Sequence, residues 1–179
     1  MKPAAQTFTI SSAAGQLEVA AFEPGKSCRG IALIGHPHPL FGGTNQNKVA
    51  QTLMRSFAKL GYWALCPNFR GVGASTGEHD HGIGEAEDML TLAAYAQEQV
   101  GNLPIALAGF SFGAYVQATV SQRLDHQGLV LVGPAVTRFA MPTVAEQTIV
   151  IHGEHDDVVP LADVMEWARP QQLPVVVFP

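Results

Sequence analysis

Residues 105–120 read IALAGFSFGAYVQATV, and this stretch decides the fold. The apolar run Ile105–Ala108 predicts a buried strand, and the apolar residues from Phe112 onward predict a helix. Between them lies Gly109-Phe110-Ser111-Phe112-Gly113, which matches the pattern G-x-S-x-G. A strand leading into this pentapeptide and a helix leading out form the setting in which a serine sits on a sharp, strained turn.

Ser111 is therefore the candidate nucleophile. Glycines at 109 and 113 remove β-carbons that would collide with such a turn. The hydroxyl of Ser111 is expected to project above the sheet, and the amide of Phe112 to face the same point as a donor to a developing oxyanion. The alternative, a glycine-rich turn that carries a spare serine, fits the two flanking elements less well.

Working outward, short apolar strands alternate with helical patterns. The predicted strands are Thr7–Ile10, Leu17–Phe22, Ile31–Ile34, Tyr62–Cys66, Ile105–Ala108, Leu129–Val132, Thr148–Ile151 and Val175–Phe178. The predicted helices are Asn47–Leu60, Gly84–Val100, Phe112–Leu124 and Leu161–Ala168. The first two strands should form a hairpin, and the alternation predicts one α/β domain over residues 1–179, with three layers and a mainly parallel sheet covered by helices on both faces. The acids Glu85, Glu87 and Asp88 crowd the first turn of one helix, where its dipole favours them.

The loop after the third strand, GHPHPLFGG (35–43), is expected to supply the second oxyanion donor. Pro37 and Pro39 have no amide hydrogen. By elimination the amide of His38 is the best candidate, with Leu40 next. A metal site at the two histidines is disfavoured because no third ligand follows at a plausible spacing. His36 is expected to make an orienting hydrogen bond within the loop.

An acid is expected after strand 148–151, in the segment HGEHDDVVP (152–160), because the chain order of such a site is serine, acid, histidine. Asp156 fits best, with Asp157 as the runner-up. Its role would be to fix the tautomer of a histidine and to balance the imidazolium charge. The alternative role is a loop aspartate that closes an Asx-turn, which we assign to Asp157.

The glycine-rich segment Gly71–Gly77 resembles a dinucleotide-binding loop but fails the G-x-G-x-x-G pattern, because position 76 is Thr. It is interpreted as a structural turn, with Arg70 as a donor that braces the loop. No cofactor is expected.

Composition excludes several classes of function. The net charge of -5 is dispersed with no run of Lys or Arg, which argues against nucleic acid and anionic membranes as partners. No run approaches the roughly 18 apolar residues of a spanning helix, and Met1–Val19 lacks the apolar core of a signal peptide. Cys28 and Cys66 are isolated, as in a reducing compartment, so the expected location is the cytoplasm.

Five segments together are similar to the small lidless bacterial α/β hydrolases, usually grouped near the dienelactone hydrolases. They are HPHPLFGGTNQNK (36–48), NFRGVGASTG (68–77), GEAEDM (84–89), AGFSFGAY (108–115) and HGEHDDVVP (152–160). The resemblance implies a sheet of about eight strands with the second antiparallel, and a Ser–Asp–His triad in which Ser111 is the nucleophile and Asp156 the acid. Dienelactone hydrolases proper use cysteine, so the serine points away from that activity.

The triad histidine is the one departure from this pattern. In the family it lies in a loop after the final strand, whereas this sequence ends at VVVFP (175–179), and no other histidine is a good substitute. We expect that the chain is truncated and lacks that loop and the last helix, rather than being an inactive member. Without its base the chain should show little or no turnover.

The expected function is hydrolysis of small carboxylic esters or thioesters through an acyl-serine intermediate, with a small-molecule acyl substrate as partner and a homodimer as a possible assembly. The segment Gly133–Gln147 leaves room for a minimal lid only. Phe110, Phe112, Phe139 and Met141 are candidates for an acyl pocket or for plain core. The alternatives are an acyltransferase or peptidase on the same triad, and a non-catalytic binding protein on this fold.

Overall fold

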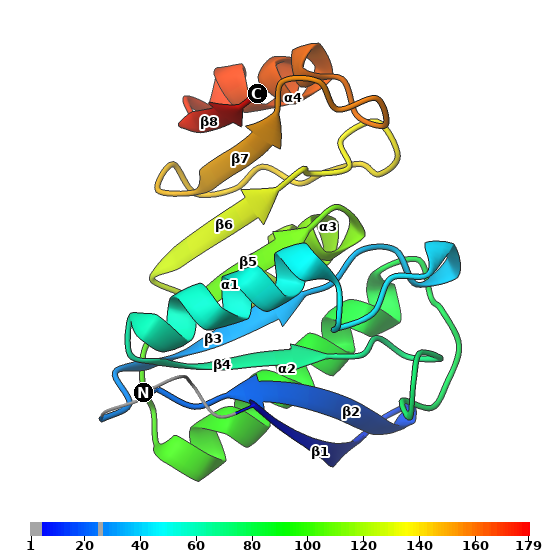
Figure 1. Cartoon of the computed structure of the whole chain (residues 1–179), viewed down its shortest axis with the longest axis vertical. Coiled ribbons are helices and arrows are strands. Elements are labelled where there is room, and N and C mark those ends of the chain that lie inside the picture. The colour runs from blue at the N-terminus through cyan, green and yellow to red at the C-terminus, as the bar shows by residue number, and fades with distance from the viewer. Residues whose placement is uncertain (1–4, 25–26) are drawn as a thin grey trace.

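The computed structural model describes residues 5–24 and 27–179, and it is a single sheet with helices on both faces (Figure 1). The strands are β1 (Ala5–Ser12), β2 (Gly15–Phe22), β3 (Gly30–Gly35), β4 (Tyr62–Pro67), β5 (Ile105–Phe110), β6 (Gly128–Val132), β7 (Ile149–Gly153) and β8 (Val175–Phe178). The α-helices are α1 (Lys48–Lys59), α2 (Ile83–Val100), α3 (Phe112–Val120) and α4 (Leu161–Ala168), and two 3₁₀ turns are η1 (Pro39–Phe41) and η2 (Arg169–Gln171). None of the described helices is long and apolar enough to cross a membrane.

The sheet has eight strands in the order β1-β2-β4-β3-β5-β6-β7-β8. β2 pairs antiparallel with both β1 and β4, and all other neighbours are parallel, which confirms the expected antiparallel second strand. From β3 the chain first moves to β4 on one side and later to β5 on the other. The loops that leave the carboxyl ends of β3 and β5 therefore diverge, and a crevice opens at this switch point.

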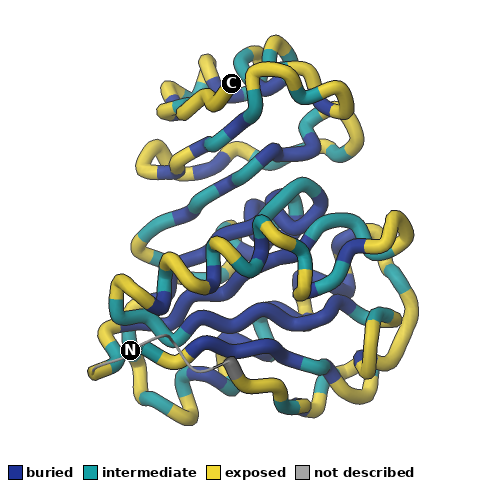
Figure 2. The backbone as a smooth tube through the Cα atoms, in the orientation of Figure 1, coloured by how far each residue is buried: buried dark blue, intermediate teal, exposed yellow. Residues whose placement is uncertain are grey.

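Alternate residues of the central strands face two separate apolar layers. In β3, Ile31 and Leu33 pack with α2 and α3, whereas Ala32 and Ile34 pack with α1. Figure 2 shows this centre as continuous buried backbone, with exposure concentrated in loops and on the outer side of α1. The three-layer α/β-hydrolase fold predicted from the sequence is confirmed.

The end of α3 and the start of β7 differ from the bounds predicted from the sequence, and local hydrogen bonds explain both differences. The helix after Ser111 ends at Val120 rather than Leu124, and residues 121–124 continue as turns. Ser121 Oγ donates to the carbonyl of Ala118 at 2.7 Å, a local hydrogen bond that competes with helix continuation. Thr148 lies in a turn, so β7 begins at Ile149 and extends to Gly153 by pairing with β8.

A close backbone contact joins β3, β5 and α3 through glycines. Gly35 and Gly109 are paired in register on neighbouring strands. Helix α3 approaches them so closely that a β-carbon on Gly113 would stand 2.2 Å from the carbonyl oxygen of Gly35. Both atoms belong to the backbone, so neither can rotate away.

This contact generates a stability prediction. Gly113→Ala should lower the free energy of unfolding by more than about 3 kcal/mol, because relief of the clash must move a helix off the sheet. The matched control is Gly128→Ala, where a β-carbon meets nothing within 4 Å and the change should stay within about 0.5 kcal/mol. Urea unfolding of both variants measures the difference. Equal stability of the two variants would contradict the close-packing argument.

Candidate active site

Ser111 occupies the strained turn between β5 and α3. Its backbone angles are φ 56° and ψ -115°, a region that L-residues other than glycine rarely adopt. Such a conformation costs on the order of 1–3 kcal/mol and persists only where the surroundings hold it. The amide of Ser111 donates to the carbonyl of Val132 at 2.9 Å, and Ser111 accepts from the amide of Ala114 at 3.0 Å, so the turn is held from both sides.

Two backbone amides near Ser111 have no acceptor among the described residues, those of Phe112 and His38. Phe112 begins α3, so its amide points out of the helix N-terminus. The amide of Leu40, the runner-up in the sequence analysis, instead donates to His38 Nδ1 at 3.2 Å. Of the two loop candidates, His38 is the one whose amide stays available.

The loop that carries His38 is anchored by the buried ring of His36. The amide of Phe69 donates to His36 Nε2 at 2.9 Å, and His36 Nδ1 lies 2.7 Å from the carbonyl of Pro37. These partners require a neutral imidazole with its proton on Nδ1. Burial lowers the pKa of His36 from 6.5 to about 4, so the ring stays neutral near pH 7. The orienting bond expected within the loop is present, and a second one reaches the loop after β4.

Asp156 lies in the loop after β7, next to Gly133 and Phe110 at the end of the neighbouring strands. Its Oδ1 accepts from the amides of Val158 and Val159, each at 2.9 Å. The Asx-turn that the sequence analysis assigned to Asp157 is thus closed by Asp156, whose Oδ1 accepts from the amides two and three residues ahead of it. Asp157 is exposed and makes no side-chain hydrogen bond to the described residues.

None of the seven histidines, all of which lie in the described residues, makes a hydrogen bond to Asp156. His152 comes nearest, with Nε2 at 3.9 Å from Asp156 Oδ2. That nitrogen is instead 2.8 Å from the carbonyl of Val159, and the ring is buried. His152 is therefore held in place by the loop after β7 and makes no hydrogen bond to Asp156. That no histidine of these residues pairs with Asp156 in a triad stays a prediction.

A cavity of about 630 Å³ opens over Ser111. It brings together Ser111, Phe112 and His38, whereas Asp156 lies outside its lining. The remaining wall residues are mostly apolar and come from the end of β5 and from the loops after β3, β6 and β7: Pro37, Phe41, Gly42, Gly43, Asn47, Phe110, Ala135, Arg138, Phe139, Val158 and Val159. Three of the four proposed acyl-pocket residues line it. Met141 does not, and packs against the core instead.

Two charged groups behind the loops were named in the sequence analysis without their partners. Arg70 makes a bidentate ion pair with the buried Asp88, at 2.8 and 2.9 Å. Asp88 is therefore the partner through which Arg70 braces the loop. Glu85 is fully buried and accepts from the amides of Asp80 and Gly82, at 2.9 and 2.8 Å. Of the three acids expected in the first turn of α2, only Glu85 lies there, so the dipole explanation does not hold for Glu87 and Asp88. Glu85 and Asp88 each tie a loop to α2 instead. The only sequence signal was their spacing within one helix.

A second histidine, His79, lies beside the His38 ring, with their centroids 4.8 Å apart, and both rings contact Phe112. His79 Nδ1 stands 2.9 Å from Glu85 Oε1, although its N–H is not aligned for a hydrogen bond. Burial lowers the pKa of His38, and the neighbouring His79 adds to this effect. His38 is thus a neutral ring that packs the loop after β3 against Phe112 at the start of α3.

Comparisons with known proteins agree with this geometry. The sequence model of the family described as serine aminopeptidase, S33 (Hydrolase_4) matches residues 40–148. The chain belongs to this hydrolase family. An α/β serine hydrolase homologue from Coxiella burnetii is 36% identical, with a TM-score of 0.90 over 97% of this chain and 86% of that one. An α/β serine hydrolase without lid from Xanthomonas campestris is 33% identical, with a TM-score of 0.92 over 98% and 84%.

An uncharacterized protein of Rickettsia prowazekii is 33% identical to this hydrolase over 144 residues. Those residues are 76% of this chain, and the chain spans 60% of the length of that relative. A dienelactone hydrolase-like protein of Klebsiella pneumoniae is 16% identical with a TM-score of 0.73. That likeness is one of fold alone, so the lidless α/β serine hydrolases are the supported relatives and the dienelactone grouping is only distant.

The neutral state of His36 generates a pH prediction. Its pKa is about 4 in the folded chain and near 6.5 when unfolded, so the unfolded chain binds the extra proton between these values. The stability contribution is complete above pH 6.5 and is lost as the pH falls toward 4, by up to about 3 kcal/mol.

Urea unfolding from pH 7.5 to 4 measures this loss. His36→Gln should flatten the pH dependence over this range. His155→Gln, which removes an exposed histidine, should leave the slope as in the parent chain. An unchanged slope in His36→Gln would show that other groups cause the acid sensitivity.

Proposed function

We propose that this hydrolase cleaves small carboxylic esters or thioesters through an acyl intermediate on Ser111. The observation that carries the proposal is the shared cavity. Ser111, in a strained conformation, lines the same cavity as Phe112 and His38, whose amides have no acceptor in the described residues. A serine nucleophile beside two free donors is the arrangement that acyl transfer requires.

In the proposed reaction Ser111 Oγ attacks the carbonyl carbon of the acyl substrate while its proton passes to a base. The carbonyl oxygen takes the negative charge and accepts hydrogen bonds from the amides of Phe112 and His38. Collapse of this intermediate expels the alcohol or thiol, which takes up the proton, and leaves the acyl-serine. Water then attacks the acyl-serine by the same steps and releases the acid.

The walls of the cavity support an ester or thioester rather than an aminopeptide substrate. An aminopeptidase must recognise a protonated α-amine, for which a carboxylate is the natural partner. Among the described residues that line the cavity, none is Asp or Glu, and Arg138 adds a positive charge. The aromatic side chains of Phe110, Phe112 and Phe139 suit the hydrocarbon part of an acyl group.

Asp156 is the proposed acid of the triad. Its Oδ1 is held by two backbone amides, which leaves Oδ2 for a histidine. The base itself is not assigned, because no histidine of the 179 residues bonds to Asp156. A serine without a base is a weak nucleophile.

The first test is intact mass after incubation of the 179-residue chain with a fluorophosphonate, with Ser111→Ala as the control. We expect one adduct, located at Ser111, which forms slowly because no histidine of these residues makes a hydrogen bond to Asp156. A folded chain that gives no adduct even after long incubation would remove the catalytic proposal and favour a binding protein on this fold.

A second test concerns the acyl acceptor and the size of the substrate. With short-chain nitrophenyl esters, the protein should turn over monomeric substrate and show no jump in rate at a lipid interface, because the link between β6 and β7 is too short for a large lid. Product analysis in the presence of competing alcohols or amines should give mainly free acid. Predominant ester or amide products would indicate an acyltransferase instead.

A further inference from the structure

A second cavity, of about 560 Å³, lies at the opposite end of the sheet from Ser111. It is lined by Trp63 near the start of β4, whereas Ser111 follows the carboxyl end of β5. Because β3 pairs parallel with both strands, these positions lie on opposite edges. The active-site proposal uses none of the residues of this second cavity.

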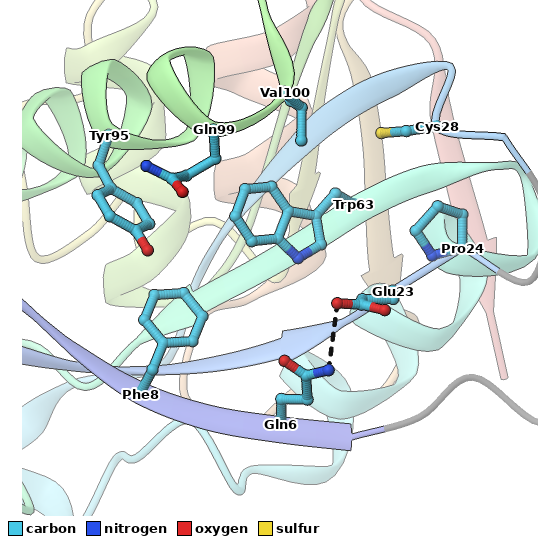
Figure 3. A pocket seen from close by; sticks show the side chains of 9 residues that line it. All are labelled: Gln6, Phe8, Glu23, Pro24, Cys28, Trp63, Tyr95, Gln99 and Val100. Carbon is cyan, nitrogen blue, oxygen red and sulfur yellow. Dashed lines mark hydrogen bonds between the residues drawn. The ribbon is translucent and has the colours of Figure 1, made fainter.

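Three aromatic rings form one wall of the second cavity (Figure 3). Phe8 of β1 stacks on Trp63 with centroids 6.3 Å apart and an angle of 22° between planes. The ring of Tyr95, from α2, lies 5.7 Å from Phe8. All three pack against the core but are only partly buried, so part of each ring remains accessible. Aromatic faces carry the negative end of the ring quadrupole and attract cations.

A carboxylate stands beside these rings. Glu23 lines the cavity, and Gln6 Nε2 donates to its Oε1 at 3.1 Å, as the dashed line in Figure 3 shows. In residues 5–24 and 27–179, no Lys, Arg or His lies within 4.0 Å of Glu23. The described lining therefore combines aromatic faces, one negative charge, and the neutral amides of Gln6 and Gln99.

The indole nitrogen of Trp63 is a second unused group. It is buried and has no hydrogen-bond partner among the described residues. A buried N–H without an acceptor costs about 1–3 kcal/mol, so an acceptor oxygen next to this edge would be favourable. A ligand hydroxyl, or Glu23 reoriented by a bound cation, could provide that oxygen.

We propose that this cavity binds a small organic ammonium cation of the choline class, with the alkylated nitrogen over Trp63 and its charge balanced by Glu23. Aromatic faces recognise such cations because the alkyl groups are apolar and the charge is diffuse. A hydrated inorganic cation would prefer several oxygen ligands, and the cavity supplies one carboxylate. The neutral carbon isostere of choline has the same shape but lacks the charge, so it separates cation recognition from simple burial.

The test is ligand-observed NMR titration of the 179-residue chain with choline and with its neutral isostere. Choline should bind saturably, and at least about fivefold more tightly than the isostere. Glu23→Gln should weaken choline binding about fivefold, and Trp63→Leu should abolish it. The matched control, Glu98→Gln, changes an exposed carboxylate of α2 outside the cavity and should have no effect.

Trp63→Phe is the control for the possibility that Trp63→Leu loses binding only because it misfolds, since phenylalanine keeps an aromatic ring at this position. It should retain the thermal transition of the parent chain and bind choline about two- to fivefold more weakly, since phenylalanine is the poorer cation partner. Equal binding of choline and its isostere, or unchanged affinity in Glu23→Gln, would overturn the proposal. Absence of saturable choline binding would overturn it as well. None of these outcomes depends on the reactivity of Ser111.

Discussion

The backbone contact between Gly35 and Gly113 is the constraint on which the rest of the site depends. It sets α3 directly on the ends of β3 and β5, at the point where the strand order reverses. The chain must then turn from β5 into α3 within one residue, and Ser111 takes up that turn at φ 56°. The same closeness brings the amide of Phe112 next to the loop that leaves β3. Strain at the serine and the position of the Phe112 amide, which we propose as an oxyanion donor, thus have one geometric origin.

Buried polar groups then hold the surrounding loops. His36 joins the loop after β3 to Phe69 in the loop after β4. Arg70 joins that second loop to α2 through Asp88, and Glu85 closes the turn before α2. Each group is paired, as buried polar atoms must be if they are to stabilise rather than destabilise the fold. The result is a rigid frame behind the elbow, and a rigid frame is what lets fixed amides stabilise a developing charge without reorganisation.

The two ends of the sheet expose different chemical groups, because the loops and helix N-termini at the carboxyl ends of parallel strands differ from the groups at the opposite ends. Helix N-termini and divergent loops gather at the carboxyl ends of the parallel strands, where amides are exposed. At the other edge, the hairpin β1–β2 and the end of α2 leave aromatic side chains and Glu23 around an open cavity. A cavity of that composition favours a cation over an anion, whereas the elbow favours a developing negative charge.

The sequence by itself determined the fold class, the turn at Ser111 between a strand and a helix, and the existence of the loops that carry His38 and Asp156. These features depend on contiguous residues, because glycine spacing, proline content and apolar periodicity act over a few positions. Only the tertiary structure showed that the amide of Leu40 donates to the side chain of His38. It also showed that Asp156 rather than Asp157 closes the Asx-turn, and that Met141 packs against the core. It also decided the partners of His36, Arg70 and Glu23. The contacts of His36 with Phe69, of Arg70 with Asp88 and of Glu23 with Gln6 join residues that lie 17 or more positions apart. Such contacts are set by strand order, which local pattern does not encode.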